Sequence, residues 1–529
     1  MSSPSASAAF TATIDALCVC ISSICRTVSS IIAVPTSPTN KDVATVCRRD
    51  GCDQPQSRRF LSHDRSYPQV MSQVISFGTD GWRDTLDRFT SPRVKQVGQA
   101  VASHLDEAGH AGETVAVGYD ARESSPGFAA DLADVLTANG FDVVMPTRDR
   151  PTPLTAYAVV DRDLAGALMV TASHNPPEYN GVKFIPDSGA PALPAVTDSI
   201  EDRLAQPDPL PPADRGARRT VDFFEPHRRH AMELLDPEPG GVTVLYDAIH
   251  GSGRGTTDEL LEGAGVTVER LRCDRDPTFD GGLPEPAPEM LEELVDRVTG
   301  GEVDLGVAND GDADRLAVVT PERGYLDENL FYAAVYDYLL EDDTGPAVRT
   351  VSTSFLVDRI AEAHDQTVAE TAVGFKWVAE EMRTTDALIG GEESGGFSIR
   401  GHIREKDGVL VALLAALAES EEPLDSRVDR LLDTYGEIHQ GKVSVDCPDE
   451  EKNQVIDGLD GLIPDSLAGE PVRDVVTIDG FKLLLSDGSW LLVRPSGTEP
   501  KMRVYAEAGS SKRVDALLAA GRELLEQVN

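Results

Sequence analysis

Between residue 72 and about residue 435, short apolar runs alternate with longer segments whose apolar residues recur at helical spacing. The pattern is clearest at residues 114–146, where TVAVGYD, PGFAADLADVLTANG and FDVVMP predict a strand, a helix and a strand. Similar units recur at residues 242–273 and 348–374. β-rich runs joined by amphipathic helices are typical of parallel or mixed α/β sheets, so the three units predict three related α/β domains.

The pattern changes after about residue 435. Residues 475–497, VVTIDGFKLLLSDGSWLLVRPSG, predict strands joined by turns, with Asp-Gly pairs as hairpin signals. The segment VDALLAAGRELLEQ predicts a closing helix, which makes this part a smaller α+β domain. A Pro-rich stretch at residues 207–216 is taken as the first linker. The predicted domains are 71–205, 206–322, 323–435 and 436–529.

The chain is strongly acidic. It has 48 Lys and Arg against 90 Asp and Glu, a formal net charge of −42 over 529 residues. Such a surface repels nucleic acid and anionic membrane, so we expect neither as a partner. The acids are spread along periodic segments and not gathered in blocks, which argues against an acidic interaction tail. We expect a cytoplasmic protein from a halophile, a cell whose molar salt screens the self-repulsion.

The first 70 residues differ from the rest. They hold 7 basic and 5 acidic residues, a charge of +2, so the other 459 residues carry −44. They also hold five of the seven cysteines, without the paired spacing of a zinc site. Residues 16–35 are mildly apolar but contain Arg26 and several serines, which is poor for a membrane span. We expect that translation starts at Met71 and that residues 1–70 are a non-native or disordered extension.

A candidate nucleophile lies in MVTASHNPPEYNGVKF, residues 169–184. Ser173 follows the apolar run LAGALMV, so it is expected just past the carboxyl end of a strand, where open α/β sheets bind ligands. His174 and Lys183 are candidate bases for it, and two prolines would stiffen the loop. For the serine alone, a turn without chemistry is the favoured alternative.

A candidate metal site lies in NDGDADR, residues 309–315. Asp310, Asp312 and Asp314 alternate, and in an extended segment residues two apart share one side, so three carboxylates would converge. Oxygen ligands alone suit a hard cation such as Mg²⁺. The alternative is a solvated acidic turn, but strand-like runs on both sides favour the metal.

A candidate sugar-binding turn is GGEESGG, residues 390–396. Its glycines would allow close approach of a ligand to the backbone. Glu392 and Ser394 would share one face, an acceptor and a donor–acceptor suited to sugar hydroxyls. A plain glycine-rich turn explains the motif about as well.

A candidate phosphate site is RPSGTEPKMRVY, residues 494–505. Arg494 and Arg503 flank Ser496, Gly497 and Thr498. Guanidinium forks, hydroxyls and free backbone amides together favour a phosphate ligand over a surface turn with a salt bridge.

Taken in this order, the motifs resemble those of the α-D-phosphohexomutase superfamily, which includes phosphoglucomutases and phosphomannomutases. The resemblance covers residues 72–529 and implies three α/β domains and a fourth of a different class around one cleft. The motifs that carry it are FGTDGWR (77–83), TASHNPPEYNGVK (171–183), NDGDADR, GGEESGG with KDG (406–408), and RPSGTEPKMR (494–503).

The resemblance also implies roles for individual residues. Ser173 would be the phosphorylated serine, with Arg83 beside it and Lys183 and His174 as acid/base candidates. The Mg²⁺ ligands would be a phosphoserine oxygen with Asp310, Asp312 and Asp314. The substrate-binding residues would be Arg315, Lys376, Glu392, Ser394, Lys406, Arg494, Ser496, Gly497, Thr498 and Arg503.

The implied activity is interconversion of glucose 1-phosphate and glucose 6-phosphate, through a phosphoserine enzyme and a hexose 1,6-bisphosphate that also serves as primer. Hexose phosphates would be the small-molecule partners; the sequence leaves the oligomeric state open. GEESGG is closer to phosphoglucomutases than to the GEMSAH form of phosphomannomutases or the GEQSGH form of phosphoglucosamine mutases, and VGFKW (373–377) resembles a loop of glucose-type members. A phosphomannomutase, a dual enzyme and a phosphoglucosamine mutase remain alternatives. A non-catalytic sugar-phosphate-binding protein is the alternative from another class.

Overall fold

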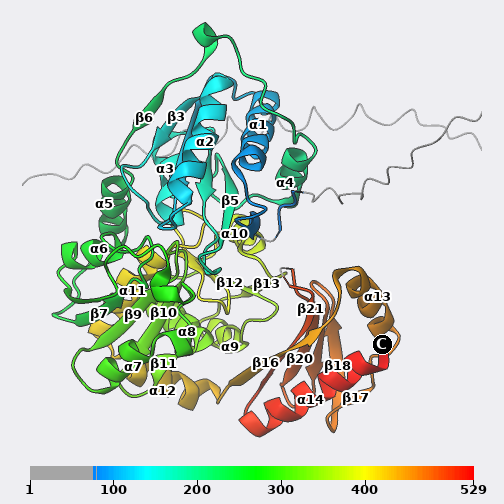
Figure 1. Ribbon diagram of the computed structural model, residues 1–529. Coiled ribbons are helices and arrows are strands. Elements are labelled where there is room, and N and C mark those ends of the chain that lie inside the picture. The colour runs from blue at the N-terminus through cyan, green and yellow to red at the C-terminus, as the bar shows by residue number, and fades with distance from the viewer. Residues whose placement is uncertain (1–74, 79, 498, 529) are drawn as a thin grey trace, which may run out of the picture. The chain divides into compact units, whose positions relative to one another are not determined.

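The computed structural model describes residues 75–78, 80–497 and 499–528 (Figure 1). The chain divides into two units, Met1–Met71 and Ser72–Asn529, and the description below concerns the second. The predicted extension at residues 1–70 and the predicted binding residue Thr498 lie outside the described residues. Within the described part, no helix combines the length and apolar character needed to cross a membrane.

The first sheet has six strands in the order β1-β5-β4-β2-β3-β6. The strands β4, β2, β3 and β6 are parallel, whereas β5 and β1 pair antiparallel with their neighbours. Along β2, Val115 and Val117 join the core shared with α1 and α2, and Ala116 joins the core shared with α3, as the two-residue period of a strand requires. The elements are β1 (Trp82–Thr85), α1 (Ser91–Ala108), β2 (Thr114–Tyr119), α2 (Ser125–Ala138), β3 (Asp142–Met145), α3 (Thr152–Arg162), β4 (Gly166–Val170), β5 (Tyr179–Pro186), α4 (Pro194–Glu201) and β6 (Arg218–Thr220).

The second sheet has the order β11-β10-β9-β7-β8, and the third has the order β13-β12-β14-β15. In each, parallel strands are followed by an antiparallel hairpin, β9–β10 or β14–β15. The elements of the second are α5 (Phe224–Leu235), β7 (Thr243–Asp247), α6 (Thr257–Gly263), β8 (Thr267–Leu271), α7 (Glu292–Thr299), β9 (Leu305–Asn309), β10 (Leu316–Thr320) and β11 (Gly324–Leu326). Those of the third are α8 (Glu328–Asp342), β12 (Ala347–Thr350), α9 (Leu356–Ala363), β13 (Val368–Thr371), α10 (Phe375–Thr385), β14 (Ile389–Gly391), β15 (Phe397–Ile399), α11 (Gly408–Glu421) and α12 (Leu424–Tyr435).

One feature recurs in all three α/β sheets and positions the predicted motifs. The hairpins are β4–β5, β9–β10 and β14–β15. The first strand of each is parallel to its other neighbour in the sheet (β2, β7 or β12), and the second strand is antiparallel to the first. The turns of these hairpins carry Ser173, the aspartates of NDGDADR, and residues 392–396 of GGEESGG, called the EESGG turn below. The sheets are therefore mixed, and the added hairpin strand is what holds each turn at both ends.

The fourth domain is an antiparallel sheet with two helices. Its strands run in the order β16-β21-β20-β19-β18-β17, and every neighbouring pair is antiparallel. The predicted fold class, three related α/β domains followed by a C-terminal α+β domain, is confirmed. The elements are β16 (His439–Asp446), α13 (Asp449–Asp460), β17 (Ser466–Leu467), β18 (Glu470–Val476), β19 (Phe481–Leu485), β20 (Trp490–Pro495), β21 (Lys501–Ala508) and α14 (Ser511–Val528).

Candidate active site

Ser173 lies in the turn between β4 and β5. Its backbone has φ of 49°, in the left-handed region that few non-glycine residues adopt at a cost on the order of 1–3 kcal/mol. The Ser173 amide donates to Thr171 Oγ1 at 2.8 Å, which helps to hold this conformation. The residue is 1% exposed, so its hydroxyl is directed into a site and not at bulk solvent.

Arg122 holds the serine turn through backbone carbonyls. Its Nη2 donates to the carbonyl oxygens of Ser173 at 2.8 Å and Asn175 at 2.6 Å, and its Nη1 donates to that of Pro176 at 2.6 Å. Its Nε donates to Asp120 Oδ2 at 3.0 Å, so the buried guanidinium is charge-paired. A rigid fork of donors can satisfy several carbonyls at once, which makes Arg122 the anchor of this turn.

Three aspartates lie on the turn between β9 and β10, in contact with the serine turn. Asp310, Asp312 and Asp314 are each at most 1% exposed, and Ser173 Oγ donates to Asp310 Oδ2 at 2.7 Å. Gly311 allows this approach, because a Cβ there would lie 2.7 Å from the Ser173 carbonyl oxygen. The candidate nucleophile and the candidate metal ligands are therefore brought together from two hairpins.

The aspartate turn fits a divalent cation. One oxygen of each carboxylate lies within 4.8 Å of the others, and the Oδ1 atoms of Asp312 and Asp314 are buried without a hydrogen-bond partner among the described residues. Burial and the two neighbouring carboxylates raise the pKa of Asp310 well above its ordinary value. Burial would also raise the pKa of Asp312, but Lys183 and the Thr152 hydroxyl outweigh it and lower that pKa. Buried anions with unsatisfied oxygens need a cation, and an all-oxygen set suits Mg²⁺.

Two buried lysines face the aspartate turn. Lys183 Nζ lies 2.9 Å from Asp314 Oδ2, 3.4 Å from Asp312 Oδ2 and 2.8 Å from Asp80 Oδ2. Lys406 Nζ lies 3.1 Å from Asp314 Oδ2 and 3.4 Å from Asp80 Oδ2. Burial would lower the pKa of Lys183, but its carboxylate neighbours hold that pKa well above its ordinary value. Burial would likewise lower the pKa of Lys406, but Asp314 and Asp80 outweigh it and raise that pKa. Both lysines are thus ammonium groups at pH 7 and add positive charge at the turn that contacts Ser173.

His174 and two arginines complete the surroundings of Ser173. His174 Nδ1 lies 3.2 Å from Ser173 Oγ. Burial, followed by the charges of Arg315 and Arg83, lowers the pKa of His174 to about 2, so its imidazole is neutral at pH 7. Arg83 Nη1 donates to Asn175 Oδ1 at 3.3 Å, and the Arg315 side chain is 21% exposed at the edge of the aspartate turn. The arginines therefore leave donors near the serine for an anionic ligand.

The EESGG turn follows β14 and contacts the loop before α10. Glu392 is buried, and its Oε1 accepts from the Gly374 amide at 2.9 Å. Burial raises the pKa of Glu392 to about 7. Lys376, in the first turn of α10, is half-buried, and burial lowers its pKa. Ser394 is half-buried two residues after Glu392, so acceptor, hydroxyl and ammonium groups are available on these two joined loops.

The turn between β20 and β21 carries the predicted phosphate-binding residues. Arg494 and Arg503 pair directly across the two strands. Lys452 of α13 fixes the turn by donating to the Ser496 carbonyl oxygen at 2.6 Å. Gly497 follows and is exposed. Two guanidiniums, a hydroxyl and exposed backbone therefore lie within one short hairpin, a composition suited to a phosphate group.

Asp479 links this turn to the third domain. Its Oδ2 accepts from Arg494 Nε at 2.8 Å and from the Val373 amide at 3.2 Å, in the loop that also carries Gly374. The predicted residues thus lie on two sets of loops, the second of which is joined by the bonds of Glu392 to Gly374 and of Asp479 to Val373 and Arg494. The first set carries Ser173, His174, Arg83, Lys183, Asp310, Asp312, Asp314, Arg315 and Lys406; the second carries Lys376, Glu392, Ser394, Arg494, Ser496, Gly497 and Arg503.

Sequence reasoning gave no role to Asp80, Arg122, Thr152 or Lys452. Asp80 lies inside the FGTDGWR motif, so its presence in a recognised motif was an available signal. Arg122 follows the carboxyl end of β2, at the edge of the sheet where ligands bind, which was a weaker signal. Thr152, which donates to Asp312 Oδ2 at 2.6 Å, and Lys452 carry no local signal.

Four family profiles match the chain. All four are described as phosphoglucomutase/phosphomannomutase domains: α/β/α domain I at residues 74–210, domain II at 227–324, domain III at 327–435 and the C-terminal domain at 443–524. Together they span nearly all of the described part of the chain.

Individual relatives match along almost their whole length. A "Probable phosphoglucosamine mutase" of Methanopyrus kandleri is 33% identical over 448 residues, covering 83% of this chain and 95% of its own. A phosphoglucomutase/phosphomannomutase of Thermococcus kodakarensis is 30% identical over 459 residues, covering 85% and 98%. The crystal structure of a protein of Thermus thermophilus, assigned as a phosphomannomutase, superposes with a TM-score of 0.75 at 33% identity, covering 86% of this chain and 100% of that one.

Proposed function

We propose, because this chain belongs to the phosphoglucomutase/phosphomannomutase family and is therefore an intramolecular phosphotransferase, that it interconverts glucose 1-phosphate and glucose 6-phosphate. Membership leaves the sugar open, since the relatives are named for glucosamine, glucose and mannose phosphates. The observation that carries the proposal is the Ser173 hydroxyl, bonded to Asp310 at 2.7 Å inside a buried ring of carboxylates and lysines.

The reaction moves one phosphoryl group in each half. A phosphoryl group on Ser173 Oγ passes to a free hydroxyl of the hexose phosphate; the hydroxyl loses its proton and Ser173 Oγ keeps the electron pair of the broken O–P bond. The hexose 1,6-bisphosphate turns round in the site, and its other phosphoryl group passes to Ser173 Oγ; the sugar oxygen keeps the electron pair of the broken O–P bond and takes up the proton lost in the first half. The same bisphosphate, supplied from outside, would prime the serine. A Mg²⁺ held by Asp310, Asp312, Asp314 and a phosphoserine oxygen would stabilise charge on the phosphoryl oxygens.

The chain's own residues position the reacting groups and balance charge. Arg122 fixes the backbone of the serine turn, which keeps Oγ in line with the sugar hydroxyl. Lys183 and Lys406 place two ammonium groups on the side of Asp314, where an incoming phosphate needs positive charge. His174, 3.2 Å from Ser173 Oγ, and Lys183 remain the two candidates for moving the proton. In the observed arrangement the neutral His174 imidazole can accept a proton, whereas the Lys183 ammonium can only donate one.

Substrate binding is assigned to residues of the second set of loops. Arg494, Ser496, Gly497 and Arg503 would bind the phosphate that is not being transferred. Glu392, Ser394 and Lys376 would contact the sugar hydroxyls. Hydroxyls, flexible ammonium groups and guanidiniums tolerate two orientations of the ligand, as the two half-reactions require.

A steric detail supports the glucose form of the site. A Cβ at Gly396 would lie 2.4 Å from Lys406 Cδ, so a side chain there is incompatible with the observed position of the lysine. The GEMSAH and GEQSGH forms carry histidine at that position. The observed position of Lys406 in KDG therefore requires the last glycine of GEESGG, Gly396. The phosphomannomutase and phosphoglucosamine mutase forms, with histidine at that position, differ from this chain.

The test is a side-by-side assay of the full chain in molar KCl with Mg²⁺ and a trace of glucose 1,6-bisphosphate. We expect turnover of glucose 1-phosphate that exceeds turnover of mannose 1-phosphate. Comparable rates would make the protein a dual phosphoglucomutase/phosphomannomutase. Turnover of mannose 1-phosphate or glucosamine 1-phosphate alone would replace the glucose assignment, and the name of the Methanopyrus relative is the reason to include glucosamine.

Arg122→Lys should lower kcat by about 10–100-fold. A lysine keeps a charge beside Asp120 but cannot donate to three carbonyls in fixed directions, and a misplacement of about 1 Å at the reacting group can cost about 100-fold. The measurement is kcat at saturating substrate, with thermal unfolding followed in parallel. Arg275→Lys, at an exposed arginine, is the matched control and should keep the wild-type kcat. Unchanged kcat in Arg122→Lys would remove the anchoring role.

A further inference from the structure

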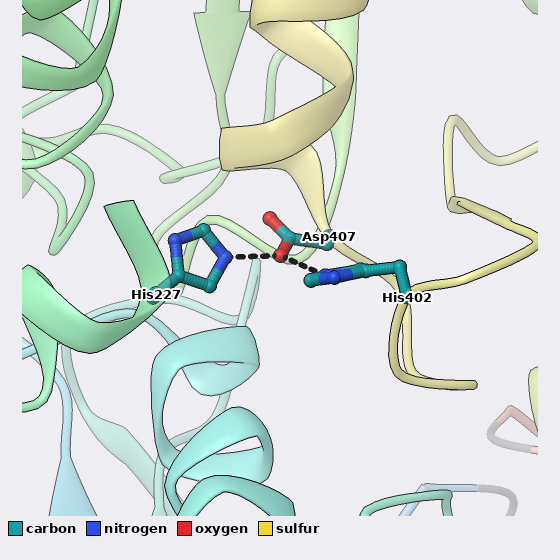
Figure 2. Close-up of side chains that lie close together, drawn as sticks. All are labelled: His227, His402 and Asp407. Carbon is teal, nitrogen blue, oxygen red and sulfur yellow. Dashed lines mark hydrogen bonds and ion pairs between the residues drawn. The ribbon is translucent and has the colours of Figure 1, made fainter. Parts of the chain in front are cut away.

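A second cluster of titratable side chains lies away from the aspartate turn. His227 of α5 and His402 of the β15–α11 turn both direct Nε2 at one oxygen of Asp407, Oδ2, at 2.6 and 2.7 Å (Figure 2). All three side chains are 0% exposed. A carboxylate buried this completely needs bonded partners, and two imidazoles supply them.

The distances decide between a metal site and hydrogen bonds. Zinc with ligands at about 2.0–2.2 Å separates neighbouring N and O ligand atoms by about 3.4 Å at a tetrahedral angle and about 2.9 Å even at a right angle. The observed separations of His227 Nε2 and His402 Nε2 from Asp407 Oδ2 are shorter than both. They match charge-assisted N–H···O bonds, so the two imidazoles are donors to the carboxylate.

Asp407 is fixed by its other oxygen as well. Its Oδ1 accepts from the amides of Val409 at 2.9 Å and Leu410 at 2.8 Å, at the first turn of the buried helix α11. Both carboxylate oxygens are thus engaged. The preceding residue, Lys406, directs its Nζ into the aspartate site, 3.1 Å from Asp314 Oδ2. The orientation of Asp407 therefore determines where the Lys406 side chain begins.

The two histidines that bond Asp407 come from different parts of the chain. His402 belongs to the same turn as Lys406, whereas His227 belongs to α5, which packs against α3 of the first sheet. Lys406 contacts Asp314, and Asp310 of the same turn accepts a hydrogen bond from Ser173, which follows β4 of the first sheet. The His227 bond thus connects the turn that carries Lys406 with α5 of the second domain, and α5 in turn packs against α3 of the domain that carries the nucleophile.

We propose that His227 and His402 are positioning residues of the phosphoryl-transfer site, holding Lys406 beside the aspartate turn through their shared bond to Asp407. The inference rests on the proposed function, because it takes the Lys406 ammonium as a partner of the hexose phosphate. Neither histidine would touch the substrate; each would act through Asp407.

A neighbouring histidine provides the control. His230, one turn after His227 on α5, stacks on His402 with 5.2 Å between ring centroids and on Tyr157 with 4.9 Å. Its Nε2 has no hydrogen-bond partner among the described residues. His230 therefore shares the aromatic packing of the cluster but not the bond to Asp407.

The first experiment compares His227→Leu with His227→Gln. Leucine removes the donor and should lower kcat about 10–100-fold, whereas the glutamine amide can still donate to Asp407 and should recover most of the loss. His402→Leu should resemble His227→Leu. His230→Leu should stay within about 3-fold of wild type, and circular dichroism confirms that each variant is folded. If His230→Leu lowers kcat as much as His227→Leu does, the proposal is overturned, because the loss would then come from disrupted aromatic packing and not from the bond to Asp407.

A double-mutant cycle with Lys406→Met separates positioning from general damage. If His227 acts through Lys406, His227→Leu should lower kcat less than about 2-fold further in the Lys406→Met background. A full additional loss there would overturn the proposal, as would one bound Zn²⁺ per chain that disappears in His227→Leu. Wild-type turnover is measured first, so that an inactive wild type counts against the proposed function, whereas a fully active His227→Leu counts against the positioning role alone.

Discussion

Ser173→Ala is expected to lower turnover of hexose phosphates by more than about 10⁴-fold while leaving the fold and substrate binding intact. The hydroxyl is the acceptor and donor of the phosphoryl group in the proposed reaction, and removal of a covalent nucleophile is among the most damaging changes an enzyme can undergo. The lost side chain is small. The bonds that hold the turn are donated by the Arg122 side chain and accepted by the backbone carbonyl oxygens of Ser173 and Asn175, so they remain. The geometry of the turn should therefore survive.

Two measurements check this prediction. Transfer of labelled phosphate from glucose 1,6-bisphosphate to the protein shows directly whether the nucleophile is present. Calorimetric titration with glucose 1-phosphate measures whether the substrate still binds. Wild type should take up the label and Ser173→Ala should not, with similar affinities for the sugar phosphate. Ser188→Ala, at an exposed serine after β5, is the matched control and should behave as wild type. Label on Ser173→Ala would mean that another residue is the nucleophile.

The sequence predicted the elements well where burial dictates them. β2, β7 and β12 are short apolar runs of 6, 5 and 4 residues before amphipathic helices, and runs this short favour a strand buried on both faces over a buried helix. The position of Ser173 after the strand β4 followed from the same pattern. The hairpins were not predicted, because the pattern of apolar residues in β5, β10 and β15 does not encode whether a strand pairs parallel or antiparallel with its neighbour.

The charge pairing of the site was beyond sequence reasoning for a different reason. Asp314 bonds Lys183 and Lys406, which are 131 and 92 positions away, so no local spacing connects them. Motif recognition named both lysines without pairing them. Arg122 and His227 belong to no recognised motif, and their roles depend on carbonyls and a carboxylate that the fold alone brings to them. Positions that act through distant partners are the ones a single sequence conceals.

Asp312→Asn is expected to weaken divalent-metal binding by about 100-fold and to lower kcat accordingly. Asp312 Oδ1 is buried without a hydrogen bond, so this oxygen is free to bind a cation, and a neutral amide removes one of three negative charges around it. The Thr152 hydroxyl and Lys183 contact Oδ2 and can still contact an amide oxygen, which should preserve the turn. Chelation with EDTA should abolish wild-type turnover, and Mg²⁺ should restore it.

Ligation has to be separated from charge, because removing any carboxylate near Lys183 makes the site less negative. Mn²⁺ prefers the same oxygen ligands, so its binding can be followed by electron paramagnetic resonance without substrate. Asp80→Asn is the matched control: Asp80 lies 2.8 Å from Lys183 Nζ but belongs to a different loop from the three ligands, so Mn²⁺ affinity should change less than about 5-fold. Equal weakening by Asp80→Asn and Asp312→Asn would mean that net charge governs metal affinity and that Asp312 is not a ligand.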